Sequence, residues 1–280
     1  MGDKAAIKTY RFLRISVVGV VGLLAASVAF ERTRANCWQP SISAYYYTPV
    51  RVIFVGGLMA IGLSLIVMKG STPLEDACLN VAGMLAAVVA VVPTSDTGAC
   101  WSVQPRPLPV NPDGSLAAWV VANIDNNVES LLLAGIAGLI IAAVIASVLN
   151  RHVLAITRIG DPGMRLSLLG AMVLLIAGVV AFRTWKDFDT QAHFVAAIAM
   201  FALVALATAT NAWERRRSEG ARWYFWLYAV IATLMVGSAA VMLPFETRWH
   251  HTDLILEMTE ISLFAAAWLV RTAEHWNETV

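Results

Sequence analysis

The sequence has little charge, few cysteines and no long polar stretch, and each shortage excludes a class of protein. Charged residues make up only 14% of the 280 residues and hydrophobic residues 59%, whereas about a quarter of the residues in a soluble domain are charged. Together with a mean hydropathy of +0.68, this composition indicates an integral membrane protein. The longest polar stretch is 93–127, so we predict a single membrane domain over residues 1–280.

Local motifs of well-known enzymes are also missing. No His-Glu-x-x-His pattern of a metal hydrolase occurs, and no Gly-x-Ser-x-Gly turn surrounds Ser41 or Ser43. The basic run at 214–217 is short and is best interpreted as a solvated anchor at the membrane surface. Nucleic acid is therefore not an expected partner, and a non-enzymatic role is favoured.

Long apolar runs are what the sequence does contain. A membrane-spanning helix needs roughly 17 to 25 mainly apolar residues. Runs of this kind lie near 12–30, 50–68, 74–92, 128–149, 164–182, 190–213, 223–244 and 254–270. The predicted fold class is all-α, a polytopic transmembrane helix bundle of about eight spans with an extracytoplasmic loop at 93–127.

Charge and cysteine positions favour one orientation in the membrane. Placing the N-terminus inside puts most of the 20 Lys and Arg residues on the cytoplasmic side, as the positive-inside rule requires. We therefore predict two cytoplasmic termini and a bacterial-type plasma membrane. In this topology Cys37 and Cys100 both lie outside, where they are either joined by a disulfide or free, and Cys78 is a packing residue.

Helix-entry patterns refine two of these boundaries. Thr72 before Pro73, with Glu75 following, predicts a capping box for the third span, and Asn126 with Glu129 predicts another for the fourth. The apolar stretch 116–124 is too short to span and is predicted to lie on the outer surface, as a lid or as a loop without function.

Small residues recur at every fourth position in two of the predicted spans. Such stripes let helix backbones approach closely in lipid, so both spans are predicted to lie inside the bundle or at a subunit contact. The stripes consist of Gly56, Ala60 and Ser64 in the second span and Ala134, Gly138, Ala142 and Ala146 in the fourth.

The last span carries the most informative pattern. Asp253, Glu257 and Glu260 follow one another at spacings of four and three residues, which places three carboxylates on one helix face. At ~1.5 Å rise per residue, Glu260 lies about 10 Å inside the end of the helix. Ionisable groups at such depth cost free energy and indicate a functional site.

The predicted topology brings further polar residues to the same side of the membrane. The second, fourth, sixth and eighth spans all begin outside, so their first turns are expected to line one outward-facing polar pocket. Its predicted lining is Glu257, Glu260, His193, Asp253, His250, His251, Glu129 and Arg51.

Three functions are compatible with that pocket. A metal-dependent hydrolase could cleave lipid at the outer leaflet with zinc as its cofactor; its candidate ligands are His193, His250, His251, Asp253 and Glu257. A carrier could use Glu257 and Glu260 to relay protons or bind a cation. A structural role would pair these residues with His193 to fix the bundle and so support a membrane complex. Expected partners are membrane lipids, a small molecule, another membrane protein or a second copy.

Three short stretches carry a family resemblance. Residues 40–47, Pro-Ser-Ile-Ser-Ala-Tyr-Tyr-Tyr, are followed by Pro49; His193 precedes Ala196, Ala197 and Phe201; and the ending runs from Glu260 to Trp268. Together they resemble DUF998 and DRAM-like multi-span membrane proteins. The resemblance implies a helical membrane bundle and no established catalytic residue.

Overall fold

The fold is all-helical. The structure, a computed structural model, describes residues 2–149, 162–216, 222–242 and 251–276. These ranges contain eight α-helices, one short 3-10 helix and no β-strand, which confirms the predicted all-α class. In chain order the elements are α1 (Gly2–Ala35), η1 (Ser43–Tyr47), α2 (Arg51–Val67), α3 (Pro73–Val91), α4 (Ala118–Leu149), α5 (Pro162–Thr184), α6 (Phe188–Arg215), α7 (Arg222–Met242) and α8 (Thr252–Glu274).

Six of the described helices, α1 and α3 to α7, are long and apolar enough to cross a membrane. The chain is therefore a multi-pass membrane protein. Helix α2 is apolar but has only 17 residues, and α8 has 23 residues but includes Glu257, Glu260 and Arg271. Eight spans and two cytoplasmic termini both stay predictions.

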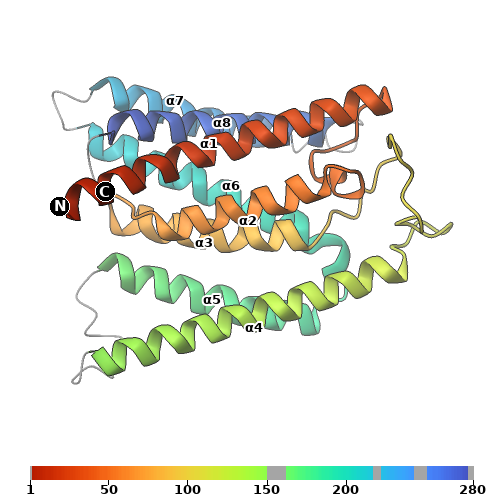
Figure 1. The fold of residues 1–280 in the computed structure, drawn as a ribbon, viewed down its shortest axis with the longest axis horizontal. Helices are drawn as coiled ribbons and strands as arrows, with labels where there is room; N and C mark the ends of the chain where they lie inside the picture. The colour runs from red at the N-terminus through yellow and green to blue at the C-terminus, as the bar shows by residue number, and fades with distance from the viewer. Residues whose placement is uncertain (1, 150–161, 217–221, 243–250, 277–280) are drawn as a thin grey trace.

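Six helices form a closed ring. Helix α1 contacts α2, α2 contacts α3, α3 contacts α6, α6 contacts α7, α7 contacts α8, and α8 returns to α1. Helices α4 and α5 pack beside α3 and lie outside the ring, as Figure 1 shows. The buried apolar core fills the ring, so a buried polar side chain there must find its partners on neighbouring ring helices.

The two ends of the bundle differ in chemistry. Helix α1 begins and α8 ends at one end, where the labels N and C lie in Figure 1; we call this the termini end. At the opposite end, Cys37 and Cys100 are joined by a disulfide with their Cα atoms 5.8 Å apart, and we call this the disulfide end. Gln39 donates to the Cys100 carbonyl oxygen at 2.7 Å. The segment that leads into η1 is thereby held against the loop that follows α3.

The start of α4 differs from the prediction. The helix begins at Ala118 rather than near 128, so the stretch 116–124 is no separate surface segment and the loop after α3 is shorter than 93–127. Asn126 and Glu129 lie inside the helix, and the capping box predicted for them is wrong. The reason is packing: Val120, Ile124 and Val128 follow one another at helical spacing and are all buried, which extends the helix toward its N-terminus.

Close helix packing occurs away from the predicted stripes. Ala134, Gly138 and Ala142 are exposed on α4, so within this chain the stripe does not face the bundle interior, although a subunit contact stays a prediction. Helices α2 and α3 instead approach at Gly62 and Gly83. A Cβ atom on Gly83 would lie 2.5 Å from the Gly62 carbonyl oxygen, so only glycine fits there. By contrast, the Thr72 cap of α3 is confirmed, since its side chain accepts from the Glu75 N–H.

Candidate functional site

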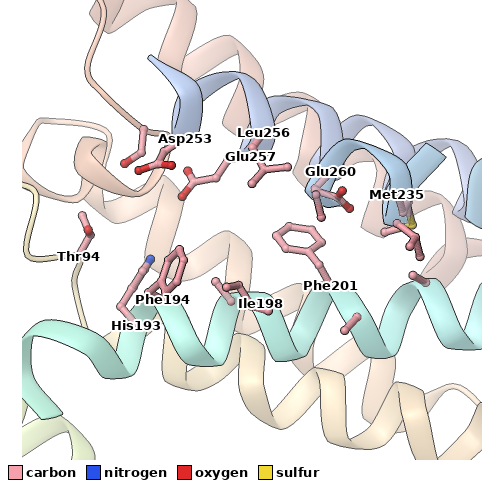
Figure 2. A pocket seen from close by; sticks show the side chains of 16 residues that line it. Thr94, His193, Phe194, Ile198, Phe201, Met235, Asp253, Leu256, Glu257 and Glu260 are labelled. Atoms are coloured by element: carbon pink, nitrogen blue, oxygen red, sulfur yellow. The ribbon is translucent and has the colours of Figure 1, made fainter. Parts of the chain in front are cut away.

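A cavity of about 240 Å³ lies between α6, α7 and α8 near the disulfide end. Figure 2 shows its polar end, where Asp253 and Glu257 of α8 face Thr94 and His193. The remaining walls are mainly apolar and include two aromatic rings from α6. Its polar lining residues are Ser41, Thr94, His193, Asp253, Glu257 and Glu260, and its larger apolar ones are Phe194, Ile198, Phe201, Met235, Val236 and Leu256.

A chain of hydrogen bonds links three elements at the polar end. His193 of α6 places Nδ1 2.5 Å from the Val92 carbonyl oxygen and Nε2 2.8 Å from Ser43 Oγ. The Ser43 hydroxyl is also 2.9 Å from Glu257 Oε1, and the Ser43 backbone N–H donates to Glu257 Oε2 at 2.9 Å. Ser43 and His193 are both buried, so the two side chains rely on these partners for their hydrogen bonds.

The number of protons in this chain follows from its geometry. A carbonyl oxygen only accepts, so His193 Nδ1 carries a proton that it donates to Val92. Two further hydrogen bonds connect Nε2, Oγ and Oε1, and the Ser43 hydroxyl can donate only one of them. The second proton must reside on Glu257 or on His193 Nε2. The complete chain is therefore neutral overall and holds one proton that these two groups share.

Glu260 lies one helical turn farther into the cavity and accepts fewer hydrogen bonds than Glu257. Its residue exposure is 4%, and its carboxylate accepts from Ser238 Oγ of α7 at 2.7 Å. The same hydroxyl is 3.0 Å from the Met235 carbonyl oxygen, so this bond is shared between two acceptors. Within the described ranges, Glu260 has no ion pair. A buried carboxylate with such sparse compensation is costly.

Tyrosines of η1 build the wall behind the polar end. Tyr47 donates from its hydroxyl to the Thr94 carbonyl oxygen at 2.8 Å, and Thr94 lines the cavity. Burial raises the pKa of Tyr47, so its hydroxyl stays a neutral donor. The Pro40 carbonyl oxygen accepts from the Leu254 N–H at 2.9 Å, which fastens the first turn of α8 to the same segment.

The structure places the predicted site residues in different parts of the molecule. His193, Asp253, Glu257 and Glu260 line one cavity. Helix α7 supplies the remaining wall, whereas the prediction assigned it to the second and fourth spans. Helix α4 is absent from the described lining because it packs on α5 and α3 outside the ring.

Three other predicted residues lie apart from this lining, and a fourth is not among the described residues. Glu129 is exposed on α4 and pairs with Arg183 at 3.4 Å on the surface. Arg51 lies over the Tyr46 ring, 4.3 Å from its centroid, and donates to its hydroxyl. His251 is exposed just before α8, and His250 lies outside the described residues.

The zinc alternative finds little support in this arrangement. Among the residues that the structure describes, no group of three or more His, Cys, Asp or Glu side chains could hold a metal ion. Both ring nitrogens of His193 are already within hydrogen-bond distance of Val92 and Ser43. A zinc-bound histidine needs one ring nitrogen for the metal, so His193 would have to abandon one of these contacts.

Sequence reasoning missed a second buried polar cluster at the termini end. Glu75 of α3 forms an ion pair with Arg271 of α8 and accepts from Asn211 Nδ2 of α6 at 2.9 Å. Arg271 also donates to the Lys69 carbonyl oxygen at 3.0 Å. We call Glu75, Arg271 and Asn211 the ion-pair cluster. The sequence did not reveal it because Glu75 had a capping explanation and Arg271 counted only as one of the basic residues on the cytoplasmic side.

Comparison with protein families, curated proteins and solved structures finds no match to this chain. The resemblance to DUF998 and DRAM-like proteins therefore stays a prediction. Any statement about function must start from the cavity and the residues that line it.

Proposed function

We propose that this membrane protein binds an amphipathic small molecule or lipid in the cavity between α6, α7 and α8. The observation that carries the proposal is the cavity's division into a polar end, at Asp253, Glu257 and His193, and longer apolar walls. Ligand sites have this composition, with a few polar groups that orient a mainly apolar contact surface.

The cavity reaches the outer surface of the bundle. Ile198 and Val236 line it although they are 41% and 63% exposed. Where α6 and α7 cross a membrane, that surface faces acyl chains, so a ligand can enter sideways from the bilayer. The volume of about 240 Å³ is below the roughly 300–1,000 Å³ of typical small-molecule sites. The ligand is therefore small, or it leaves an apolar tail in the lipid.

The orientation that fits best places the disulfide end outside the cell. A disulfide persists in an oxidising compartment, and the exterior of a bacterial-type plasma membrane is one. Arg215 ends α6, Arg216 follows it, and Arg222 begins α7, at the opposite end of the bundle, as expected for a cytoplasmic side. In this orientation the polar end of the cavity lies at the outer leaflet.

A serine hydrolase is the obvious competing function, because Ser43 Oγ is 2.8 Å from His193 Nε2. Two features of the site oppose it. The Ser43 hydroxyl has a single proton and contacts both Glu257 and His193, so that proton is not reserved for transfer to His193. The Ser43 N–H, which would be a natural oxyanion donor, already bonds to Glu257.

Photolabelling tests the binding proposal. The protein is reconstituted into phosphatidylcholine nanodiscs with an octan-1-ol that carries a diazirine, irradiated, and digested for peptide mass spectrometry. We expect label on the cavity peptides of α6 and α8. Ala197→Phe, which fills the cavity lining, should remove this label.

Ala142→Phe is the matched control, since Ala142 is exposed on α4 away from the cavity. It should leave the cavity label unchanged. Uniform labelling of all lipid-facing helices, equal in the wild type and in Ala197→Phe, would contradict the proposal.

A further inference from the structure

We infer that the cavity's ligand is an amphipathic organic cation, an alkylammonium in its simplest form. This inference rests on the proposed binding function and specifies the chemistry of the ligand. Glu260 lines the cavity beside the neutral chain of Glu257, Ser43 and His193, and no Lys or Arg is among the described residues that line it.

Glu260 is the strongest single indication. Its carboxylate is buried, lines the cavity and receives one hydrogen bond that Ser238 shares with the Met235 carbonyl oxygen. One oxygen, Oε2, has no donor within the described part of the chain. A buried anion normally has an ion-pair partner, and here the adjacent space is open where that partner would lie.

The spacing of the carboxylates suits an ammonium group. Glu257 and Glu260 are three residues apart on α8, which separates them by about 4.5 Å along the helix axis. A primary ammonium has three N–H donors and no acceptor, as in a lysine side chain. It can therefore donate to Glu260 Oε2, while its remaining N–H groups reach the lone pairs that the Ser43 bonds leave on Glu257, whereas a carboxylate or phosphate ligand would be repelled by Glu260.

The apolar walls are equally suitable for a cation with a hydrocarbon tail. Figure 2 shows the rings of Phe194 and Phe201 rising from α6 toward α8, the helix that carries the carboxylates. Aromatic faces attract cations within about 6 Å of the ring centroid. Beyond the rings, Ile198 and Val236 lead to the exposed surface of the bundle, where an alkyl tail would lie.

Competition against the photolabel tests this inference with three probes of equal chain length. Octylammonium, octan-1-ol and octanoate are titrated in phosphatidylcholine nanodiscs, and the concentration that halves cavity labelling is measured for each. We expect octylammonium to compete at a concentration about 10- to 100-fold below that of octan-1-ol, because a hydrogen bond to a buried charge is that much stronger than a neutral one. Octanoate should be the weakest competitor.

Glu260→Gln should reduce the preference for octylammonium to within about threefold of octan-1-ol, while labelling by the neutral probe persists and reports that the fold is intact. Glu129→Gln makes the same change on an exposed carboxylate outside the cavity and should leave the preference unchanged. If Glu260→Gln gives no labelling at all, the comparison is made with Glu257→Gln.

Each outcome decides between the two proposals. Equal competition by octylammonium and octan-1-ol in the wild type would overturn the cation inference and leave the binding proposal standing. If Glu129→Gln lost as much of the preference for octylammonium as Glu260→Gln, the cation inference would also be overturned, because the preference would then come from general surface charge. Absence of cavity labelling in the wild type would overturn the binding proposal itself.

Discussion

The two ends of the bundle both bury carboxylates, but only one of them compensates the charge. In the ion-pair cluster, Glu75 is fully buried and contacts Arg271 and Asn211, and the adjacent space is about 20 Å³. At the disulfide end, Glu257 shares a proton with His193 through Ser43, whereas Glu260 borders about 240 Å³ of open space with one hydroxyl donor and no cation among the described residues.

This difference separates structure from function. A buried ion pair with no room around it connects α3, α6 and α8 and has no capacity for a ligand. An uncompensated carboxylate such as Glu260 beside open space is costly for stability, and such a cost at a cavity is expected where a ligand is bound. Burial of a charge alone would have assigned the same role to both ends.

The largest effect is expected from breaking the ion-pair cluster. Arg271→Met leaves Glu75 buried without its cation and should lower the free energy of unfolding by about 3–5 kcal/mol. Titration with a denaturing detergent measures it. The double variant Glu75→Gln with Arg271→Met should recover most of the loss, because it contains no unpaired charge. A single variant as stable as the wild type would show that the pair does not hold this end together.

The stability of the disulfide end should depend on the bond between Cys37 and Cys100. Cys37 and Cys100 are separated by 63 residues, and removing a bond that closes such a loop typically costs about 2–4 kcal/mol. Cys37→Ser should therefore lower the unfolding free energy by that amount and make it independent of added reductant. The free thiol Cys78 provides the control: Cys78→Ala should keep the sensitivity to reductant. Wild-type stability that does not respond to reductant would contradict the prediction.

Ser43 should matter for stability less than either of these bonds. Ser43→Ala removes the hydroxyl between His193 and Glu257 but keeps the backbone N–H that donates to Glu257. The expected loss is about 1–3 kcal/mol, the cost of leaving buried polar groups without a partner. Ser262→Ala removes an exposed hydroxyl that bonds only within α8 and should change the unfolding free energy by less than about 0.5 kcal/mol. Equal effects of the two changes would argue against the hydrogen-bond chain.

The smallest change in stability is expected at Glu260. Glu260→Gln should change the unfolding free energy by no more than about 1 kcal/mol. The change can have either sign, because the amide removes an uncompensated charge. The same substitution at Glu75 should cost several times more, since Arg271 would be left without its partner. Thermal unfolding of the two variants side by side measures the contrast. Equal losses would mean that both carboxylates are structural.

Hydropathy and helix chemistry were reliable guides where one segment decides its own structure. The apolar runs yielded the all-α fold, and the Thr72 cap formed as predicted. Hydropathy and capping patterns do not predict structure that depends on packing between segments. Residues 118–124 belong to α4 because Val120 and Ile124 are buried. The described part of the small-residue stripe of α4 is exposed because α4 lies outside the ring.

The carboxylates of α8 were predictable from the sequence, but their partners were not. The spacing of Asp253, Glu257 and Glu260 on one helix face was readable from sequence, and all three line one cavity. Their partners were not readable. Ser43 and Ser238 come from η1 and α7, and nothing local distinguishes them from other serines. The ion pair between Arg271 and Glu75 joins two helices that are far apart in the sequence, and no local pattern predicts it.

A helical, membrane-embedded chain with carboxylates deep in one helix follows from the amino-acid sequence, because hydropathy and the 3.6-residue period act within a single segment. Which carboxylate has a counter-charge and which faces open space follows from the packing of the helices. Both depend on how the six helices of the ring meet, and the contacts between them join residues far apart in the chain, such as Glu75 with Arg271 and Ser43 with His193 and Glu257.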